Sequence, residues 1–381
     1  MEIKQEEYIM KRWEREVKDG ILYTFTDIDG INFPFQLYIP FKLSDKPDIV
    51  LAMRTPREQN NLSFDDALKE CALSAPNPLG RLLSYGLGNI CLMPVIPRVG
   101  GIQSSYLAYY TYHNDFDKAF SNIEKGRIKF TKEDVLKFTD LDKQIYMMIQ
   151  TTMDYLKTKG INVDNKVIAS GYSAAAKFVT HFAALHTDIV KAIVAGGTGG
   201  NHIIPDKSLD LLFPLGVSDI PNFDEDAFKK IQKFYFVGDN DYNDLTCYLP
   251  KYEEDEEGNY LRDFIGNRIT KRNDSLKGYH EEERDGKVVL IPDYVPFDKI
   301  DFDLDKDGNY QLAYTGYYTL EQVTYIINNI GDNVQTRFDK MKEIYNDLGV
   351  NGVFKKYPGD HATVFDNQEL YTDVESFINN I

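Results

Sequence analysis

The sequence contains few cysteines, no excess of positive charge and no long hydrophobic run. Its 381 residues include only three cysteines, which are Cys71, Cys91 and Cys247. Three widely spaced cysteines form neither a disulfide framework nor a metal-ligand cluster, so we expect free thiols in a reducing compartment. Acidic residues outnumber basic ones by 60 to 43, which gives a formal net charge of −17. This charge argues against nucleic acids and anionic membrane surfaces as partners.

Two further segment types are missing from the chain. No apolar run approaches the length that a membrane span needs. Residues Met1 to Lys18 are charged and amphipathic, and they lack the apolar stretch of a signal peptide. A cytoplasmic protein is therefore expected. Aromatic residues make up 13% of the chain, so its composition and length indicate a large folded core and exclude a disordered chain.

Helix and strand patterns alternate in the manner of a doubly wound α/β sheet. Two strands, 21–27 and 33–39, are expected to pair antiparallel around a turn at Asp29 and Gly30. Further strands are predicted at 48–53, 89–96, 167–169, 190–195, 231–238 and 350–357. Helices are predicted at 79–85 and 136–159, after Ser173, and at 334–348 and 367–378.

One strand-to-helix junction carries a serine in a pattern with chemical meaning. Gly171-Tyr172-Ser173-Ala174-Ala175 follows an apolar strand and precedes a helix of small residues. Small residues two positions away on each side permit a sharp turn that exposes the Ser173 hydroxyl. The N-terminus of the following helix directs free N–H groups at negative charge that develops nearby. Ser173 can therefore act as a nucleophile if a base lies within reach, although the same pattern also occurs in plain tight turns.

Two later segments supply an acid and a base. Asp241 stands three residues after Gly238, where a strand of β-branched and aromatic residues ends. His361 follows a strand that closes with Pro358-Gly359. Because sites form outside the carboxyl ends of parallel strands, we expect Ser173, Asp241 and His361 to meet at one edge of the sheet. His361 would then take the serine proton, and Asp241 would hold the imidazole in the required tautomer.

These three segments together resemble the α/β-hydrolase superfamily. The resemblance covers roughly residues 20–245 and 331–381 and is greatest to the carboxylesterase and polyester-depolymerase branches; Ala175 replaces the commoner glycine. It implies an α/β-hydrolase fold with a mostly parallel, doubly wound sheet. It also implies a serine hydrolase that cleaves a carboxylic ester through an acyl-enzyme, with Ser173, His361 and Asp241 as the triad. Neither a metal nor an organic cofactor is implied.

The resemblance further implies an oxyanion hole with two N–H donors. One donor is the backbone N–H of Ala174, and the other comes from the loop after strand 48–53. That loop reads Met53-Arg54-Thr55-Pro56, without the His-Gly of many relatives, so the second donor is expected at Arg54 or Thr55. An equal alternative is that the Arg54 side chain forms a salt bridge with a core carboxylate. The substrate pocket is expected to include Tyr172, His202 and Tyr242.

A long interval separates the acid from the histidine. Asp241 and His361 lie 120 positions apart, whereas a strand, loop, helix and strand need only about thirty to forty. We therefore expect residues 1–244 and 331–381 to form the core and residues 245–330 to form an insertion. The insertion leaves and returns at the catalytic edge, which favours a cap over the site; a peripheral or oligomerising appendage is the alternative. Residues 198–222 are a candidate for a second lid element.

Three other patterns fit a functional site less well. The Gly196–Gly200 run lacks the Lys-Ser/Thr of a phosphate-binding loop, and we interpret it as a flexible exit from a strand. Asp303 begins a run like a calcium loop, but the twelfth position is Tyr314 in place of glutamate, which favours a solvated turn. Asp239 and Asp244 are alternative acids with poorer spacing.

Two alternatives to an ester hydrolase stay open at this stage. A serine peptidase or amidase would use the same triad, and a catalytically silent binding protein would keep the fold but lack a working oxyanion hole. The expected partner is a small-molecule ester or amide. The sequence does not indicate the oligomeric state.

Overall fold

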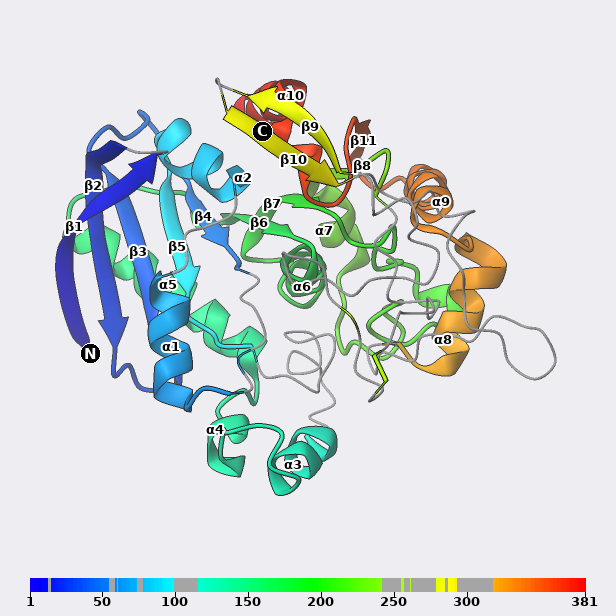
Figure 1. Cartoon of the computed structure of the whole chain (residues 1–381), viewed down its shortest axis with the longest axis horizontal. Helices are drawn as coiled ribbons and strands as arrows, with labels where there is room; N and C mark the ends of the chain where they lie inside the picture. Colours follow the sequence, from blue (N-terminus) through cyan, green and yellow to red (C-terminus); the bar gives the residue numbers. More distant parts are fainter. Residues whose placement is uncertain are drawn as a thin grey trace.

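The computed structural model describes residues 1–12, 15–54, 59, 61–73, 78–98, 116–241, 255–256, 261, 279–284, 287–292 and 318–381. These residues form a sheet of nine strands, ordered β1-β2-β3-β5-β4-β6-β7-β8-β11. Figure 1 shows the antiparallel β1 to β3 at one end and helices α8 and α9 toward the other. The strands are β1 (Glu2–Arg12), β2 (Arg15–Thr26), β3 (Phe35–Pro40), β4 (Ile49–Ala52), β5 (Ile90–Pro94), β6 (Val167–Tyr172), β7 (Val190–Gly196), β8 (Gln232–Gly238) and β11 (Val353–Tyr357).

The sheet is mostly parallel. Strands β5, β4, β6, β7, β8 and β11 run in one direction, and β3 joins β5 antiparallel. The predicted antiparallel pair is confirmed as β2 and β3. The sequence does not predict β1, which pairs with β2 from Glu2 to Arg12. An edge strand tolerates many charged residues, so β1 lacks the apolar alternation by which strands are recognised.

Helices cover both faces of the sheet. Alternate residues of each central strand belong to two separate core clusters; in β4, Ile49 and Leu51 belong to one and Val50 and Ala52 to the other. Burial on both faces explains why these strands read as continuous apolar runs. The first cluster includes residues of α5 (Leu141–Thr158), α6 (Ala174–Leu185) and α9 (Val334–Asp347). The second includes residues of α2 (Pro78–Arg81), η1 (Leu82–Gly86) and α10 (Gln368–Asn379).

The remaining helices are short. They are α1 (Phe64–Leu73), α3 (Asp117–Glu124), α4 (Lys132–Leu136), η3 (Lys207–Leu209), α7 (Glu225–Lys230), α8 (Leu320–Tyr325), η5 (Ile326–Ile330) and η6 (Thr363–Asp366). The predicted helix 136–159 corresponds to α5, which begins later, at Leu141, because Asp140 adopts a positive φ of 51° that a helix interior does not accept. No helix in the described ranges is long and apolar enough to cross a membrane.

Much of the predicted insertion, residues 245–330, lies outside the described residues, as does the calcium-loop-like run. Strands β9 (Tyr279–Arg284) and β10 (Lys287–Pro292) form an antiparallel pair separate from the main sheet. The end of the segment packs into the main core, because Val323, Ile326 and Ile330 belong to the same cluster as α6. The role of residues 245–330 as a cap stays a prediction.

The second predicted lid element is part of the core. Within residues 198–222, Ile203, Ile204, Leu215 and Val217 are fully buried in the main cluster. The backbone N–H of Ile204 donates to the carbonyl of Leu215 at 2.8 Å, so the segment folds back on itself. These apolar residues therefore fill the core, and a lid role for the rest of the segment stays a prediction.

Two of the three cysteines are buried free thiols, Cys71 and Cys91; Cys247 lies outside the described residues. Burial raises the pKa of Cys71 to about 11 and that of Cys91 to about 12. Both therefore stay protonated at neutral pH, and neither has the thiolate character that a nucleophile needs.

Candidate active site

Ser173 occupies the sharp turn between β6 and α6. Its backbone angles, φ 58° and ψ −124°, are rare for a residue other than glycine. Gly171 permits the turn: a Cβ atom on Gly171 would lie 2.4 Å from the Ala175 carbonyl oxygen. The turn therefore has the strained strand-to-helix form that exposes a nucleophilic hydroxyl.

The backbone around Ser173 is fixed to the next strand. The Ser173 N–H donates to the Gly196 carbonyl at 2.9 Å, at the end of β7. Ala174 is the first residue of α6, and in the described part of the chain its N–H has no hydrogen-bond acceptor. This N–H is thus available to a negative oxygen that develops beside Ser173.

Asp241 and His361 are in direct contact. His361 Nδ1 lies 2.9 Å from Asp241 Oδ2, across 120 positions of sequence. The Asp241 side chain is 1% exposed and that of His361 is 25% exposed, so the carboxylate is buried and the imidazole reaches solvent. With Asp241 ionised, Nδ1–H is the donor in this hydrogen bond. Nε2 is then left as the acceptor that a general base requires.

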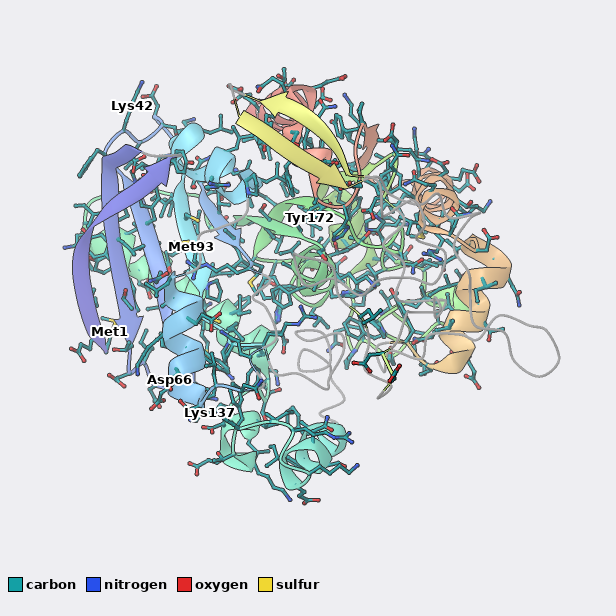
Figure 2. The ribbon with its side chains drawn as sticks, in the orientation of Figure 1. Met1, Lys42, Asp66, Met93, Lys137 and Tyr172 are labelled. Atoms are coloured by element: carbon teal, nitrogen blue, oxygen red, sulfur yellow. The ribbon has the colours of Figure 1, made fainter. Side chains whose placement is uncertain are left out.

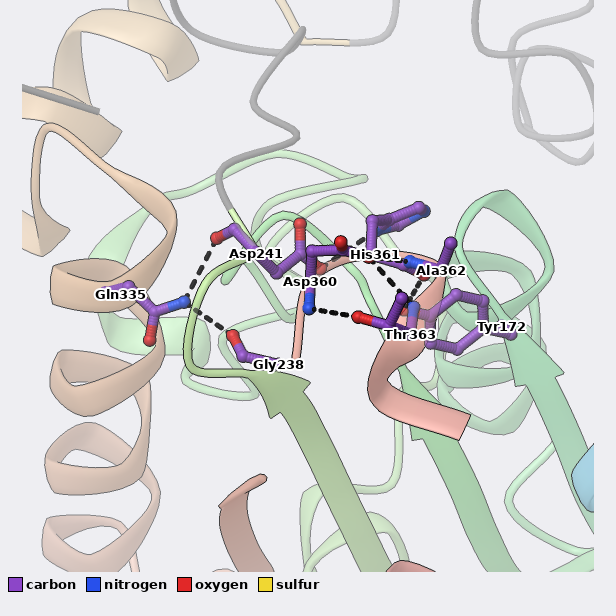
Figure 3. Close-up of polar contacts among 8 residues, drawn as sticks. All are labelled: Tyr172, Gly238, Asp241, Gln335, Asp360, His361, Ala362 and Thr363. Carbon is purple, nitrogen blue, oxygen red and sulfur yellow. Dashed lines mark hydrogen bonds and ion pairs between the residues drawn. The ribbon is translucent and has the colours of Figure 1, made fainter. Parts of the chain in front are cut away.

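A tight turn holds His361 at the end of β11. The Asp360 carboxylate oxygen Oδ1 accepts from the N–H of Ala362 at 2.6 Å and of Thr363 at 2.8 Å (Figure 3). In return, the Asp360 N–H donates to Thr363 Oγ1 at 2.9 Å. Such side-chain to backbone bonds define a local turn. Asp360 therefore shapes the loop that carries the imidazole.

The acid loop is joined to this histidine loop. The Asp239 N–H donates to the Tyr357 carbonyl at 2.8 Å, and the Asn240 N–H donates to the Gly359 carbonyl at 2.9 Å. Asp239 Oδ1 accepts from the Gly359 N–H at 3.0 Å. The carboxylate of the alternative acid Asp239 therefore accepts a backbone hydrogen bond. The other alternative acid, Asp244, lies outside the described residues.

Tyr172 connects the serine turn to the histidine loop. Its hydroxyl donates to the His361 carbonyl at 2.6 Å, and its ring centroid lies 5.0 Å from that of the imidazole. Figure 2 shows Tyr172 near the middle of the molecule, at the end of β6. The sequence predicts a pocket residue here. In the structure, the Tyr172 hydroxyl is a hydrogen-bond donor to the His361 carbonyl, and the role of Tyr172 in a pocket stays a prediction.

Ser173 and His361 lie at the same rim of the sheet without a hydrogen bond between the hydroxyl and Nε2. Gly197, directly after the Gly196 partner of Ser173, lies so close to the imidazole that an added Cβ would meet His361 Cε1 at 2.9 Å. Catalytic hydrogen bonds are often long in enzymes without substrate and shorten in the complex.

The Arg54 side chain is directed into the core. Its guanidinium donates to the Cys71 carbonyl at 2.6 Å and to Gln36 Oε1 at 2.9 Å, and it contacts Met93 Sδ at 3.0 Å. These three partners are neutral, and the salt bridge of Arg54 with a core carboxylate stays a prediction. Thr55 and Tyr242 lie outside the described residues. The second oxyanion donor, at Arg54 or Thr55, stays a prediction.

His202 lies among aromatic side chains of the core. It is 3% exposed, and its ring centroid is 3.9 Å from that of Tyr235 and 5.7 Å from that of Phe354. Burial lowers the pKa of His202 to about 3, so the imidazole is neutral. The role of His202 as a pocket residue stays a prediction.

One residue near the acid is not predicted from the sequence. The Gln335 side-chain amide donates to the Gly238 carbonyl at 2.8 Å and to the Asp241 carbonyl at 3.0 Å (Figure 3). Gln335 stands at the start of α9, far from Asp241 in sequence, and no local pattern indicates this contact. The described residues contain no group of three or more His, Cys, Asp or Glu side chains that could hold a metal ion.

A mostly parallel sheet carries the serine turn after β6, the acid after β8 and the histidine after β11. The chain has an α/β-hydrolase fold. No protein-family model and no curated protein sequence matches the chain. Several solved structures are similar to the chain at low identity.

The chain is similar to poly(aspartic acid) hydrolase-1 from Sphingomonas sp. KT-1, with 14% identity and a TM-score of 0.46 over 93% of this chain and 97% of that one. It is similar to a ferulic acid esterase, with 11% identity and a TM-score of 0.41 over 94% and 97%. It is also similar to an S-formylglutathione hydrolase from Agrobacterium tumefaciens, with 9% identity and a TM-score of 0.39 over 99% and 98%. At TM-scores below 0.5, these likenesses carry no inference about activity.

Proposed function

We propose that the protein is a serine hydrolase that cleaves a carboxylic ester through an acyl-enzyme. The observation that carries the proposal is the 2.9 Å contact between His361 Nδ1 and the buried Asp241 Oδ2. This contact lies at the rim of the sheet where Ser173, with its φ of 58°, immediately precedes α6. A buried carboxylate, a partly exposed imidazole and a serine on a strained turn are the groups that acyl transfer to serine requires.

The reaction has two stages. Ser173 Oγ attacks the acyl carbon while His361 Nε2 takes its proton, and the Ala174 N–H with a donor at Arg54 or Thr55 binds the oxyanion. The tetrahedral intermediate collapses, and the imidazolium gives its proton to the departing alcohol. Water, activated by His361, then attacks the acyl-enzyme and releases the acid. Asp241 stabilises the imidazolium in both stages, and its burial strengthens that interaction because the local dielectric is low.

A fluorophosphonate probe tests the nucleophile. We expect the probe to label the wild-type protein and to leave Ser173→Ala unlabelled. Ser218→Ala is the matched control, because the Ser218 hydroxyl donates to the Leu211 carbonyl at 2.9 Å; this variant should label like the wild type. Labelling of Ser173→Ala, or a folded wild-type protein that does not react, would contradict the proposal. The second result would favour a catalytically silent binding protein.

The leaving group needs a separate measurement, because a serine peptidase or amidase would use the same residues. A panel of 4-nitrophenyl acyl esters and aminoacyl 4-nitroanilides compares alcohol-type with amine leaving groups. We expect kcat/KM to be higher for at least one ester than for every anilide. Faster cleavage of an anilide would support the peptidase or amidase alternative and overturn the ester assignment, while the triad would stand.

A further inference from the structure

We infer that Gln335 is a positioning residue that holds Asp241 in place for His361. The inference rests on the proposed function, because Asp241 acts as the triad acid only in that mechanism. Gln335 lies in the first turn of α9 and contacts neither Ser173 nor the imidazole in the hydrogen bonds of the described residues. It acts on the acid through the backbone of the acid loop (Figure 3).

The acid loop, defined as Gly238–Asp241, is a four-residue turn closed by a hydrogen bond. The Asp241 N–H donates to the Gly238 carbonyl at 3.0 Å. The Gln335 Nε2 group donates to that same Gly238 oxygen at 2.8 Å and to the Asp241 oxygen at 3.0 Å. One amide group therefore joins the first and last carbonyls of the turn and restricts the distance between them. Such a bridge uses both N–H bonds of the side chain.

The other side of the acid loop is held by the histidine loop, through the bonds of Asp239 and Asn240 to Tyr357 and Gly359. Gln335, in α9, holds the acid loop from the opposite side. The start of α9 is itself fixed, because Asn333 Oδ1 accepts from the Thr336 N–H at 2.9 Å and Arg337 Nε donates to the Gly199 carbonyl at 3.0 Å. The backbone that carries Gln335 is thus held by hydrogen bonds on both sides. Small displacements of a catalytic group cost much of the rate, so this support is expected to matter for turnover.

The chain offers a matched control for a substitution at Gln335. Gln322, in α8, also donates from Nε2 to two backbone carbonyls, those of Leu212 at 2.7 Å and Phe213 at 3.4 Å. Its Oε1 additionally accepts from the Thr319 N–H at 3.0 Å. Methionine has a similar length and volume and cannot donate. Each of the variants Gln335→Met and Gln322→Met therefore removes two side-chain hydrogen bonds to backbone carbonyls. Those of Gln335 include the Asp241 carbonyl, whereas those of Gln322 lie in another part of the chain.

Two readouts are measured on both variants of the full chain. Steady-state hydrolysis of the best ester gives kcat and KM. Proton NMR follows the downfield resonance of the His361 Nδ1–H, assigned by its loss in His361→Ala. For Gln335→Met we expect kcat to fall roughly tenfold with KM nearly unchanged, and the Nδ1–H resonance to move upfield or broaden. For Gln322→Met we expect wild-type values of kcat and of the resonance, with a melting temperature at least as low as that of Gln335→Met.

Wild-type kcat and resonance in Gln335→Met would overturn the inference, as would an equal loss of kcat in Gln322→Met. If Gln335→Met does not fold, Gln335→Asn replaces it, because its amide is one methylene too short to reach both carbonyls. The NMR readout separates this inference from the proposed function. If the wild-type protein neither reacts with the fluorophosphonate probe nor hydrolyses esters, the proposed function is wrong. The His361 Nδ1–H resonance would still show whether Gln335 holds the Asp241–His361 pair.

Discussion

Ser173 is held in a conformation that costs on the order of 1–3 kcal/mol for a residue other than glycine. Its N–H is bonded to the Gly196 carbonyl, and its own carbonyl accepts from Ala176 N–H at 3.0 Å and Lys177 N–H at 3.3 Å. The start of α6 and the end of β7 therefore offset the strain. Because these bonds involve only the backbone, the hydroxyl stays available for chemistry at the rim of the sheet.

Removal of the Tyr172 hydroxyl should slow turnover without weakening substrate binding. Tyr172→Phe deletes the 2.6 Å hydrogen bond to the His361 carbonyl and keeps the ring contact with Phe365, whose centroid lies 4.5 Å away. The imidazole then loses one restraint, so we expect kcat to fall about three- to tenfold with KM unchanged. Steady-state ester hydrolysis measures both constants.

Tyr371→Phe is the control for this prediction. The Tyr371 hydroxyl also donates to a backbone carbonyl, that of Phe365, at 2.9 Å, and it does not contact the triad residues. The two variants remove the same chemical group and should lose about 1 kcal/mol of unfolding free energy each. An equal fall of kcat in both would show that Tyr172 has no specific effect on His361.

At the scale of elements, the Gly196–Gly200 loop joins β7 to its neighbours by close approach. The sequence favours a flexible strand exit, but each of several glycines lies where a side chain would collide. A Cβ on Gly196 would meet the Phe236 ring at 2.2 Å, and one on Gly200 would meet the Val334 carbonyl at 2.4 Å. The loop is therefore packed between β8 and α9. The glycine run reflects limited space and needs no phosphate ligand to explain it.

Gly197→Ala should damage the active site more than the fold. Gly197 has a φ of 65°, and an added Cβ would lie 2.7 Å from Tyr172 Cζ and 2.9 Å from His361 Cε1. The imidazole must move to make room, so we expect kcat to fall at least about tenfold and the free energy of unfolding to fall by about 2 kcal/mol. Urea unfolding and ester hydrolysis provide the two measurements.

Gly160→Ala separates backbone strain from collision. Gly160 has a similar φ of 71°, and nothing lies within 4 Å of its added Cβ. This variant should lose about 1 kcal/mol of unfolding free energy and keep wild-type kcat. If Gly160→Ala loses as much activity as Gly197→Ala, the proximity of Gly197 to His361 does not explain the effect.

At the scale of the whole molecule, the sequence predicts the parallel core and the strand ends well, because both depend on local patterns. Central strands buried on both faces are continuous apolar runs. Asp241 and His361, predicted to meet beyond the ends of β8 and β11, lie 2.9 Å apart. Features that depend on packing through space are not predicted. The contact of Gln335 with the acid loop and the burial of His202 both follow from how α9 and residues 198–222 fill the core.

Two buried histidines, His181 and His202, make the free energy of unfolding depend on pH. His181 is a buried residue of α6, and its ring nitrogens lie 2.6 Å from the carbonyl of Lys177 in α6 and 2.8 Å from that of Pro214. Burial lowers the pKa of His181 to about 4 and that of His202 to about 3. Between the unfolded pKa, about 6.5, and these values, the unfolded chain binds protons that the native state does not. Stability is therefore fully present above pH 6.5 and falls as the pH decreases toward 4.

The His202 contribution can be isolated by substitution. At pH 5, each of the two histidines should lower the free energy of unfolding by about 2 kcal/mol relative to pH 7.5. His202→Phe keeps a ring among Tyr235 and Phe354 and removes one titrating group, so its loss between the two pH values should be smaller than that of the wild type by about 2 kcal/mol. Urea unfolding at pH 7.5 and pH 5 measures the difference within each protein, which cancels any packing cost of the new side chain. If both proteins lose the same stability, protonation of His202 does not contribute to acid unfolding, and the other ionisable groups account for it.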